Sequence, residues 1–193
     1  ISAAKPANAE RTREAAKVKS LLRRIDRGLS ARMRRRPPVP ATAPEAPTFS
    51  ILLPSRNRLE LLGYAIETVR RQDFGDYEII VADNCSDDRY DRLTDGLRDP
   101  RIRYFRSDQP LSVTANWNRA LGHARGDYVV MLGDDDGLAP GFLRRMAAHL
   151  AAFHRPDLIY CKAFHYCYPN VSPSARKGYL ASLSNSILFQ EHT

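Results

Sequence analysis

The sequence predicts an α/β domain built on a doubly wound, mostly parallel β-sheet. Three observations support this prediction. From residue 48 onward, short apolar runs alternate with amphipathic segments. The runs are apolar at consecutive positions, as in strands that are buried on both faces. Polar clusters follow several of the runs where they end. Strands that alternate with helices in this way are typical of parallel sheets with crossover connections.

Each predicted element follows from its own pattern. Buried strands are expected at 49–53 (FSILL) and 77–82 (YEIIVA), and further strands at 101–106 (RIRYFR), 127–133 (DYVVMLG) and 157–167 (DLIYCKAFHYC). Helices are expected at 59–72, 88–97, 112–124 and directly after Pro140. In the first of these helices, Leu62, Ile66 and Val69 share one face, which is the spacing of an amphipathic helix.

Charge and composition divide the 193 residues into three parts. Residues 1–36 form a predicted basic amphipathic helical tail, and residues 48–193 form the predicted domain. Between them, residues 37–47 hold five prolines in eleven positions, which is typical of an extended linker. Residues 1–40 hold 12 Lys and Arg against 3 Asp and Glu, whereas residues 41–193 hold 18 against 19. The net charge of +8 therefore belongs to the tail, and nucleic-acid binding is not expected of the domain.

The tail has one further implication. Residues 11–35 carry an apolar stripe among lysines and arginines, and such a helix is suited to an anionic membrane surface. Peripheral contact with the inner membrane face is one interpretation of this pattern, and a solvated helix, a coiled-coil arm or disorder is the other. No apolar run approaches the roughly 20 residues of a membrane span, and the three cysteines lack a disulfide-framework spacing. A cytoplasmic location is expected.

An acidic cluster follows the strand predicted at 127–133. In VVMLGDDDGLAP (129–140), Asp134, Asp135 and Asp136 adjoin one another. Carboxylates about 5 Å apart repel by roughly 3 kcal/mol per pair at an effective dielectric near 20. Such a cluster is therefore tolerated when it is fully solvated or when a cation neutralises it.

Polar clusters also follow two other predicted strands. PSRNR (54–58) follows the first strand and DNCSDD (83–88) the second. Ligands bind outside the carboxyl ends of strands in open α/β sheets, so we expect the three clusters to line one pocket. The sequence contains neither GxGxxG after the first strand nor a phosphate-binding GxxxxGK[ST] motif. A phosphate group would instead require a divalent cation, Mn²⁺ or Mg²⁺, which commonly takes one or two carboxylates together with substrate phosphates.

Three motifs resemble those of a known family. FSILLPSRNR, IIVADNCSDD and ARGDYVVMLGDDDGLAPGFL, in this order and spacing, are similar to the family 2 nucleotide-sugar glycosyltransferases of the Rossmann-like GT-A fold. The resemblance covers about residues 48–167. It implies a metal-dependent, inverting enzyme that moves a sugar from a nucleoside-diphosphate sugar to the hydroxyl of a glycan or another acceptor. Residues 48–193 would then be a nucleotide-sugar-binding domain that is truncated at its C-terminus.

The resemblance also implies roles for individual residues. Those expected to hold the donor nucleotide are Pro54, Ser55, Arg56, Asn57, Asp83, Asn118 and Asp134. Asp83 would accept a hydrogen bond from the imide N–H of a pyrimidine, which favours UDP or dTDP as the nucleotide. Asp134 would lie near the ribose. Asp135, and after it Asp136, would bind the metal. The family's frequent arginine beside Asn118 is replaced by Trp117.

Catalysis by inversion also requires a general base, which in the family is usually an Asp on a later segment. The only acids after Asp136 are Asp157 and Glu191. Neither has the family's context, so we expect the base to lie beyond Thr193. One alternative is a non-catalytic sugar-nucleotide-binding module. Another is a haloacid-dehalogenase-type phosphatase with Asp134 as nucleophile and Asp136 as acid, although no later acidic pair is present to bind Mg²⁺.

Overall fold

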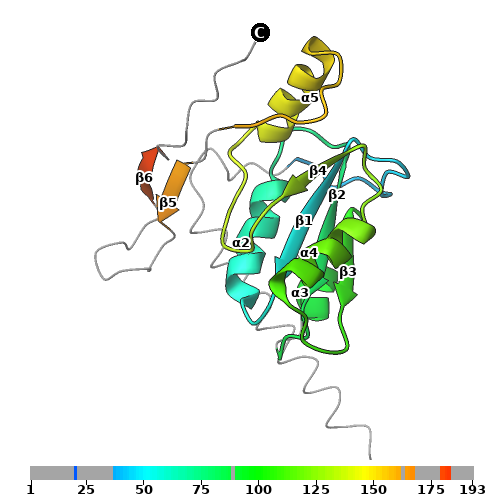
Figure 1. Cartoon of the computed structure of the whole chain (residues 1–193), viewed down its shortest axis with the longest axis vertical. Coiled ribbons are helices and arrows are strands. Elements are labelled where there is room, and N and C mark those ends of the chain that lie inside the picture. Colours follow the sequence, from blue (N-terminus) through cyan, green and yellow to red (C-terminus); the bar gives the residue numbers. More distant parts are fainter. Residues whose placement is uncertain (1–19, 21–36, 88–89, 162–163, 168–178, 184–193) are drawn as a thin grey trace, which may run out of the picture.

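The computed structural model of the protein describes residues 20, 37–87, 90–161, 164–167 and 179–183. A four-stranded sheet in the order β3-β2-β1-β4 forms its centre, and every pairing in this sheet is parallel. The strands are β1 (Phe49–Ser55), β2 (Tyr77–Asp83), β3 (Ile102–Arg106) and β4 (Tyr128–Met131). The predicted α/β fold with a parallel sheet is confirmed (Figure 1).

Helices cover both faces of this sheet. They are α2 (Leu59–Arg70), α3 (Tyr90–Leu97), α4 (Val113–Gly122) and α5 (Phe142–Ala152). Buried side chains of α2, α3 and α5 share one hydrophobic cluster with β1 and β2. Ala120 of α4 packs with Leu52 and Ile80 in a second cluster on the opposite face. The sheet is therefore doubly wound.

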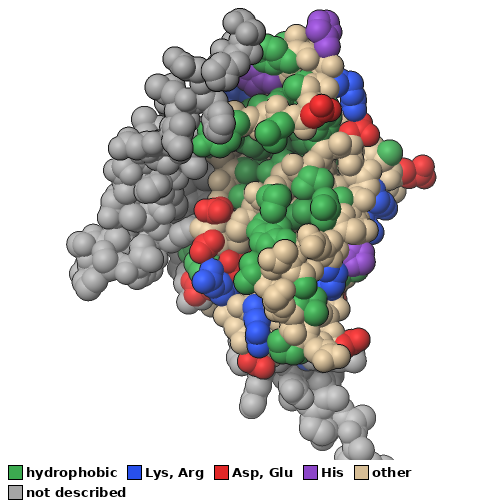
Figure 2. Space-filling view, viewed as in Figure 1, with side chains coloured by type: hydrophobic (Ala, Val, Ile, Leu, Met, Phe, Trp, Pro, Cys, Tyr) green, Lys and Arg blue, Asp and Glu red, His purple; other side chains and the backbone are tan. Residues whose placement is uncertain are grey.

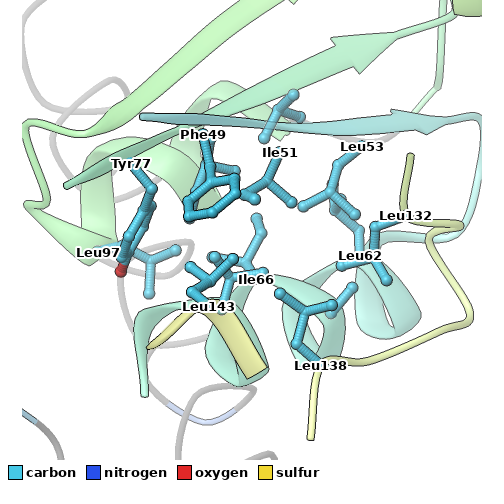
Figure 3. Close-up of a cluster of buried hydrophobic side chains, with 14 of the residues drawn as sticks. Phe49, Ile51, Leu53, Leu62, Ile66, Tyr77, Leu97, Leu132, Leu138 and Leu143 are labelled. Atoms are coloured by element: carbon cyan, nitrogen blue, oxygen red, sulfur yellow. The ribbon is translucent and has the colours of Figure 1, made fainter. Parts of the chain in front are cut away.

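The larger cluster explains the helical periodicity in the sequence. Ile51 and Leu53 of β1 point toward Leu62 and Ile66 of α2, with Leu143 of α5 beside them (Figure 3). All five side chains are completely buried. Because β1 also contributes Leu52 to the other face, its apolar residues run consecutively instead of alternating with polar ones.

The connection from β3 to β4 creates a switch in topology. β1, β2 and β3 follow one another across the sheet, but the chain then returns through α4 and places β4 on the other side of β1. Adjacent crossovers therefore diverge between β1 and β4, which is where open α/β sheets bind ligands. Ser55 pairs with Asp83 in the register of β1 and β2, so the polar segments after these strands begin at the same level.

A buried carboxylate stabilises the opposite, amino end of the sheet. Glu78 of β2 accepts hydrogen bonds from Ser50 Oγ at 2.7 Å, Arg103 Nη1 at 2.8 Å and the Arg125 backbone N–H at 2.8 Å. Burial alone would raise the pKa of Glu78, but these hydrogen bonds outweigh burial and lower it. Glu78 therefore remains ionised and joins three strands and the segment before β4.

The predicted strand at 157–167 differs from the observed structure. Among the described residues of this range, Phe164–Cys167 forms a strand, β5, which pairs antiparallel with β6 (Tyr179–Leu183) in a separate two-stranded sheet. Residues 157–161 lie outside any strand, and the Leu158 side chain is exposed. The apolar pattern alone cannot reveal this outcome, because a strand also needs a neighbouring strand to accept its hydrogen bonds.

The segments before the domain are described only in part. Residues 37–47, the predicted linker, contain no helix or strand. The predicted basic helix at 11–35 lies, apart from Ser20, outside the described residues, so membrane contact remains a prediction. Within the described ranges, none of the helices combines the length and apolar character of a bilayer span.

Candidate functional site

The segments that follow β1 and β4 meet through a direct hydrogen bond. Ser55, the last residue of β1, donates its Oγ hydrogen to Oδ2 of Asp134 at 2.6 Å. Both residues are buried. Asp134 lies three residues after β4, so this bond joins the two strands at the switch in topology. The sequence prediction that these two polar clusters share one site is consistent with this contact.

Tyr90 extends this contact into a chain with a fixed direction. Its hydroxyl lies 3.0 Å from Ser55 Oγ and accepts a hydrogen bond of 2.6 Å from the backbone N–H of Arg58. Ser55 has a single hydroxyl hydrogen and gives it to Asp134, so Tyr90 must be the donor to Ser55. Burial raises the pKa of Tyr90, which keeps the phenol protonated for this role.

Arg58 places a positive charge on the acidic cluster. Its Nη1 lies 3.2 Å from Oδ1 of Asp134 and 3.0 Å from Oδ2 of Asp135. The charge of Asp134, followed by that of Asp135, raises the pKa of the Arg58 guanidinium. The side chain is half exposed, so solvent weakens these attractions. One cation of the protein itself thus offsets part of the charge of the cluster.

The carboxylates of Asp135 and Asp136 converge beside Gly133. A Cβ atom built on Gly133 would lie 2.9 Å from Asp136 Oδ2 and 3.0 Å from Asp135 Oδ1. Both acids are exposed residues. Partial burial of the Asp136 carboxyl group, together with the charge of Asp135, raises its pKa. Two hard oxygen ligands therefore lie at the solvent-facing side of the site.

The segments after β1 and β2 are also tied together. The Asn57 side chain donates to Asp87 Oδ2 at 3.0 Å and accepts from the Asp87 backbone N–H at 2.8 Å. The Asn57 backbone N–H donates to Ser86 Oγ at 3.0 Å. Asn57 and Cys85 adopt φ values of 54° and 53°, which are uncommon for residues other than glycine. Such backbone conformations concentrate at functional sites.

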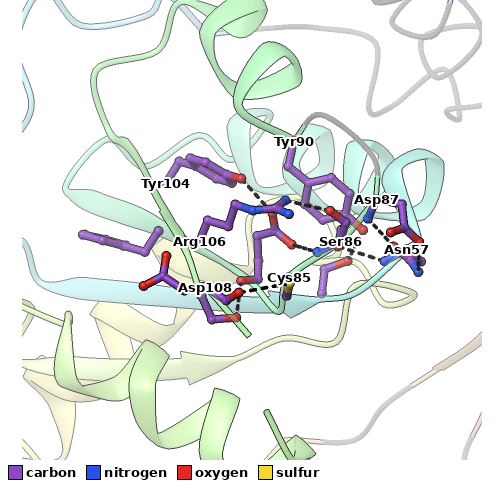
Figure 4. A network of polar contacts seen from close by, with 12 residues as sticks. Asn57, Cys85, Ser86, Asp87, Tyr90, Tyr104, Arg106 and Asp108 are labelled. Carbon is purple, nitrogen blue, oxygen red and sulfur yellow. Dashed lines mark hydrogen bonds and ion pairs between the residues drawn. The ribbon is translucent and has the colours of Figure 1, made fainter. Parts of the chain in front are cut away.

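Asp83 is buried in a network of hydrogen bonds at the end of β2. Its Oδ1 accepts from the backbone N–H of Ser86 at 2.9 Å, and its Oδ2 accepts from Tyr104 at 2.7 Å and Arg106 at 3.0 Å. Figure 4 shows the Arg106 side chain between Tyr104 and Ser86 in this network. The carboxylate is completely buried, whereas the Arg106 side chain is 44% exposed. Arg106 therefore connects this buried carboxylate to the surface.

Other predicted residues lie farther from this network. Arg56 is exposed, and Pro54 is partly buried at the end of β1. Asn118 is exposed on α4, and the contacts recorded among the described residues do not link it to Asp134. Its neighbour Arg119 instead donates to the Asp83 backbone carbonyl at 2.8 Å. α4 therefore supports the end of β2 through Arg119.

Arg58 and Tyr90 were not among the predicted site residues. Arg58 belongs to the same PSRNR cluster as Arg56, so the sequence contains a signal for a basic residue but not for which of the two faces the acids. Tyr90 reads as an apolar position of a short helix. Only the three-dimensional arrangement reveals that its hydroxyl lies between Ser55 and the Arg58 backbone.

Within the described ranges, no three Asp, Glu, His or Cys side chains gather closely enough to hold a metal ion. A cation bound by Asp135 and Asp136 would therefore need oxygen ligands from water or from a bound molecule. Magnesium sites are commonly completed in this way by substrate phosphates.

Comparison with known proteins identifies the family. Residues 50–191 match the family model described as glycosyl transferase family 2. The chain belongs to this family. A GalNAc(5)-diNAcBac-PP-undecaprenol β-1,3-glucosyltransferase of Campylobacter jejuni is 39% identical over 100 residues, which are 50% of this chain and 32% of that protein. The succinoglycan biosynthesis protein ExoO of Rhizobium meliloti is 30% identical over 107 residues, which are 55% of this chain and 31% of that protein. The match thus spans about a third of each of these family 2 relatives.

Solved structures support the same fold for this family 2 chain. The crystal structure of residues 1–349 of S. aureus TarS superimposes with a TM-score of 0.53 at 23% sequence identity, over 55% of this chain and 33% of that one. The structure of the same protein in complex with UDP-GlcNAc matches with a TM-score of 0.51 at 24% identity, over 55% and 32%. The GT-A fold expected from the sequence is confirmed.

Proposed function

We propose that this chain is the donor-binding part of an inverting glycosyltransferase that uses a nucleoside-diphosphate sugar and a divalent cation. One observation carries the proposal. The hydrogen bond between Ser55 and Asp134 unites the ends of β1 and β4 at the switch in topology, with Asp135 and Asp136 on its solvent side. Membership of glycosyltransferase family 2 supports sugar transfer as the chemistry.

Three features of the acidic segment fit a divalent cation. The donor set consists of carboxylate oxygens, which Mn²⁺ and Mg²⁺ prefer. The missing side chain of Gly133 leaves the space in which the Asp135 and Asp136 oxygens approach one another. The Arg58 guanidinium already stands where positive charge is favourable. When bound, such a cation supplies Lewis-acid neutralisation of a departing diphosphate. Asp134, held by Ser55, would remain oriented toward the ribose.

A pyrimidine nucleotide is proposed because Asp83 lies at the end of β2. Its Oδ2 has two donors, Tyr104 and Arg106. If the exposed Arg106 side chain turned away, the imide N–H of uracil or thymine would replace its hydrogen bond. UDP and dTDP are therefore the nucleotides that we propose. S. aureus TarS, which shares the fold, was solved in complex with UDP-GlcNAc, and this agrees with the proposal.

The catalytic base is proposed to lie outside the described residues. Asp157 is the only acid described after Asp136. It follows Arg155, which pairs with Asp127 at 2.8 Å, one residue before β4 begins. Asp157 is therefore near the amino end of β4, whereas the acidic cluster lies beyond its carboxyl end. A base that accepts the proton of an acceptor hydroxyl must lie within hydrogen-bonding reach of that hydroxyl.

The alternatives have less support. A phosphatase would require Asp134 to attack phosphorus, but this carboxylate is buried and both of its oxygens have donors, Ser55 and Arg58. A non-catalytic binding module would use the same donor site. It differs from the enzyme only in the absence of a base.

Thermal unfolding of the 193-residue chain tests the proposal. UDP-, dTDP- and GDP-sugars are each added with Mn²⁺ and with a chelator, because a ligand that binds only the folded state raises the melting temperature. The proposal predicts a rise with UDP- or dTDP-sugars that depends on Mn²⁺. Arg106→Ala, which uncovers Asp83, is expected to retain this rise. A chain that responds to no donor would contradict the proposal, and a response that persists in chelator would contradict the role of the metal.

A further inference from the structure

Arg58 combines a backbone that is held by hydrogen bonds with a charged group that is half exposed to solvent. Its backbone N–H donates to Tyr90 and its carbonyl accepts from Leu62 N in the first turn of α2. Half of its side chain is exposed, and the guanidinium contacts the acids only through Nη1. The remaining N–H donors of a guanidinium are suited to planar oxyanions such as phosphate.

The position of Arg58 conflicts with a divalent cation at the same acids. Nη1 lies 3.0 Å from Oδ2 of Asp135, the residue proposed as the first metal ligand. A divalent ion on that carboxylate would lie within several ångströms of the guanidinium, and the two positive charges would repel. At a separation of about 6 Å in water, this repulsion corresponds to roughly a tenfold loss of affinity.

A diphosphate resolves this conflict. Its oxygens would complete the ligand set of the cation, which the described protein residues alone do not provide. They would also offer the guanidinium an alternative anionic partner. Arg58 needs only a change in its side-chain rotamers to move from Asp135, because its backbone is anchored by Tyr90.

We propose that Arg58 is a built-in counterion that competes with the divalent cation for Asp135 and transfers to the diphosphate when the donor binds. The proposal rests on the function proposed above and adds a coupling between its two ligands. In the free protein, Arg58 weakens metal binding. With the nucleotide present, this competition is relieved. Because such coupling is reciprocal, the metal strengthens nucleotide binding by the same factor.

The affinity for Mn²⁺, measured by titration calorimetry and by the EPR signal of free Mn²⁺, tests this coupling without relying on activity. The 193-residue chain is compared with Arg58→Gln, Arg58→Lys and the control Arg144→Gln, with and without UDP. Arg144 is a matched control because it is also exposed and pairs with an exposed acid, Asp73, at 2.8 Å.

Arg58→Gln is expected to bind Mn²⁺ alone about tenfold more tightly than the unmodified chain and to gain less affinity from UDP. Arg58→Lys retains the charge and is expected to resemble the unmodified chain in metal binding, as is Arg144→Gln. Equal or weaker Mn²⁺ binding by Arg58→Gln, or an undiminished gain from UDP, would overturn the role of Arg58. If neither the unmodified chain nor Arg58→Gln binds Mn²⁺, both proposals are overturned. If the affinity for UDP depends neither on Mn²⁺ nor on Arg58, the coupling is overturned, but the proposal of nucleotide binding stands.

Circular dichroism and denaturant unfolding exclude a folding defect. Arg58→Gln removes the guanidinium but leaves the backbone N–H that donates to Tyr90, so the variant is expected to retain the fold. Its melting temperature without metal should fall slightly, because the acids lose their counterion, and Mn²⁺ should restore it. A variant that Mn²⁺ does not restore would contradict competition at this position.

Discussion

Ser55 Oγ lies 2.6 Å from Asp134 Oδ2, although 79 positions separate the two residues in the sequence. This buried hydrogen bond joins the end of β1 to the acidic segment after β4, beside the contacts that Arg58 makes with the same segment. With Tyr90 as the donor behind Ser55, the orientation of Asp134 depends on residues from two other parts of the chain, the end of β1 and the start of α3. Each of these residues has a measurable effect on stability or on ligand binding.

Ser55→Ala is expected to reduce the free energy of unfolding by about 1–3 kcal/mol. The substitution removes a donor from the buried Asp134 and the acceptor of the Tyr90 hydroxyl. Urea denaturation measures the change. Tyr90→Phe breaks the same chain at the next position, so the double variant should lose less than the sum of the single losses. Fully additive losses would show that the two contacts are independent.

Asp135→Asn is expected to abolish Mn²⁺-dependent stabilisation by a UDP- or dTDP-sugar while leaving the melting temperature of the free chain nearly unchanged. The residue is exposed and its partner Arg58 is half exposed, so its contribution to folding is small. Asp73→Asn serves as the control, because Asp73 forms a comparable exposed pair with Arg144. If both variants respond to metal and donor as the unmodified chain does, Asp135 is not the metal ligand.

Gly133→Ala is expected to weaken Mn²⁺ binding with little change in stability. The new methyl group would lie 2.9–3.0 Å from oxygens of Asp136 and Asp135, and these flexible side chains would turn away from it. Gly122→Ala is a suitable control because nothing lies within 4 Å of its added Cβ. Calorimetric titration with Mn²⁺ in the presence of UDP measures the effect. Unchanged affinity in Gly133→Ala would mean that the cation does not use both carboxylates in this arrangement.

Glu78 is expected to contribute to acid unfolding. Its pKa is lowered in the folded protein by hydrogen bonds that include those from Arg103 and Ser50, so the unfolded chain binds a proton more readily. The stabilisation is therefore complete above the ordinary glutamate pKa of about 4.3 and is lost as the pH falls from there through the lowered folded value.

The matched variant for this test is Glu78→Gln, which cannot titrate. The variant should be less stable at neutral pH by about 3 kcal/mol. The reason is that Arg103 and Arg125 lose the buried negative charge with which they pair. Its stability should also fall less steeply between pH 5 and pH 3 in denaturant titrations. Parallel pH profiles for the two proteins would contradict the contribution of Glu78.

The central sheet could be predicted from the sequence because β1 and β2 are buried on both faces and therefore carry consecutive apolar residues. The gathering of the polar clusters at one edge follows from the same prediction, since the parallel strands of one sheet end at the same edge. Whether β1 would neighbour β4 could not be read from local pattern. That neighbourhood depends on the crossover through α4, and it determines which acid Ser55 contacts.

The choice between Arg56 and Arg58 was also beyond the sequence. Both flank Asn57, whose positive φ turns the chain between them. After the turn, Arg58 faces Asp134, whereas Arg56 is exposed. Likewise, Asn118 shared the expected motif, but Asn116 and Arg119 are the α4 side chains that bond the backbone at the end of β2. These outcomes depend on helix rotation and turn geometry, which residue identity does not specify.

The outer edge of β4 has a practical consequence for handling the protein. β4 pairs only with β1 in the described part of the chain, and its Val129 and Met131 side chains are 38% and 66% exposed. Figure 2 shows hydrophobic side chains gathered on the viewed face of the molecule. Where an apolar edge strand has no partner, as β4 has none on this side within the described residues, it can recruit other strands. Purified samples should therefore self-associate as their concentration rises, and light scattering at several dilutions belongs alongside every binding measurement.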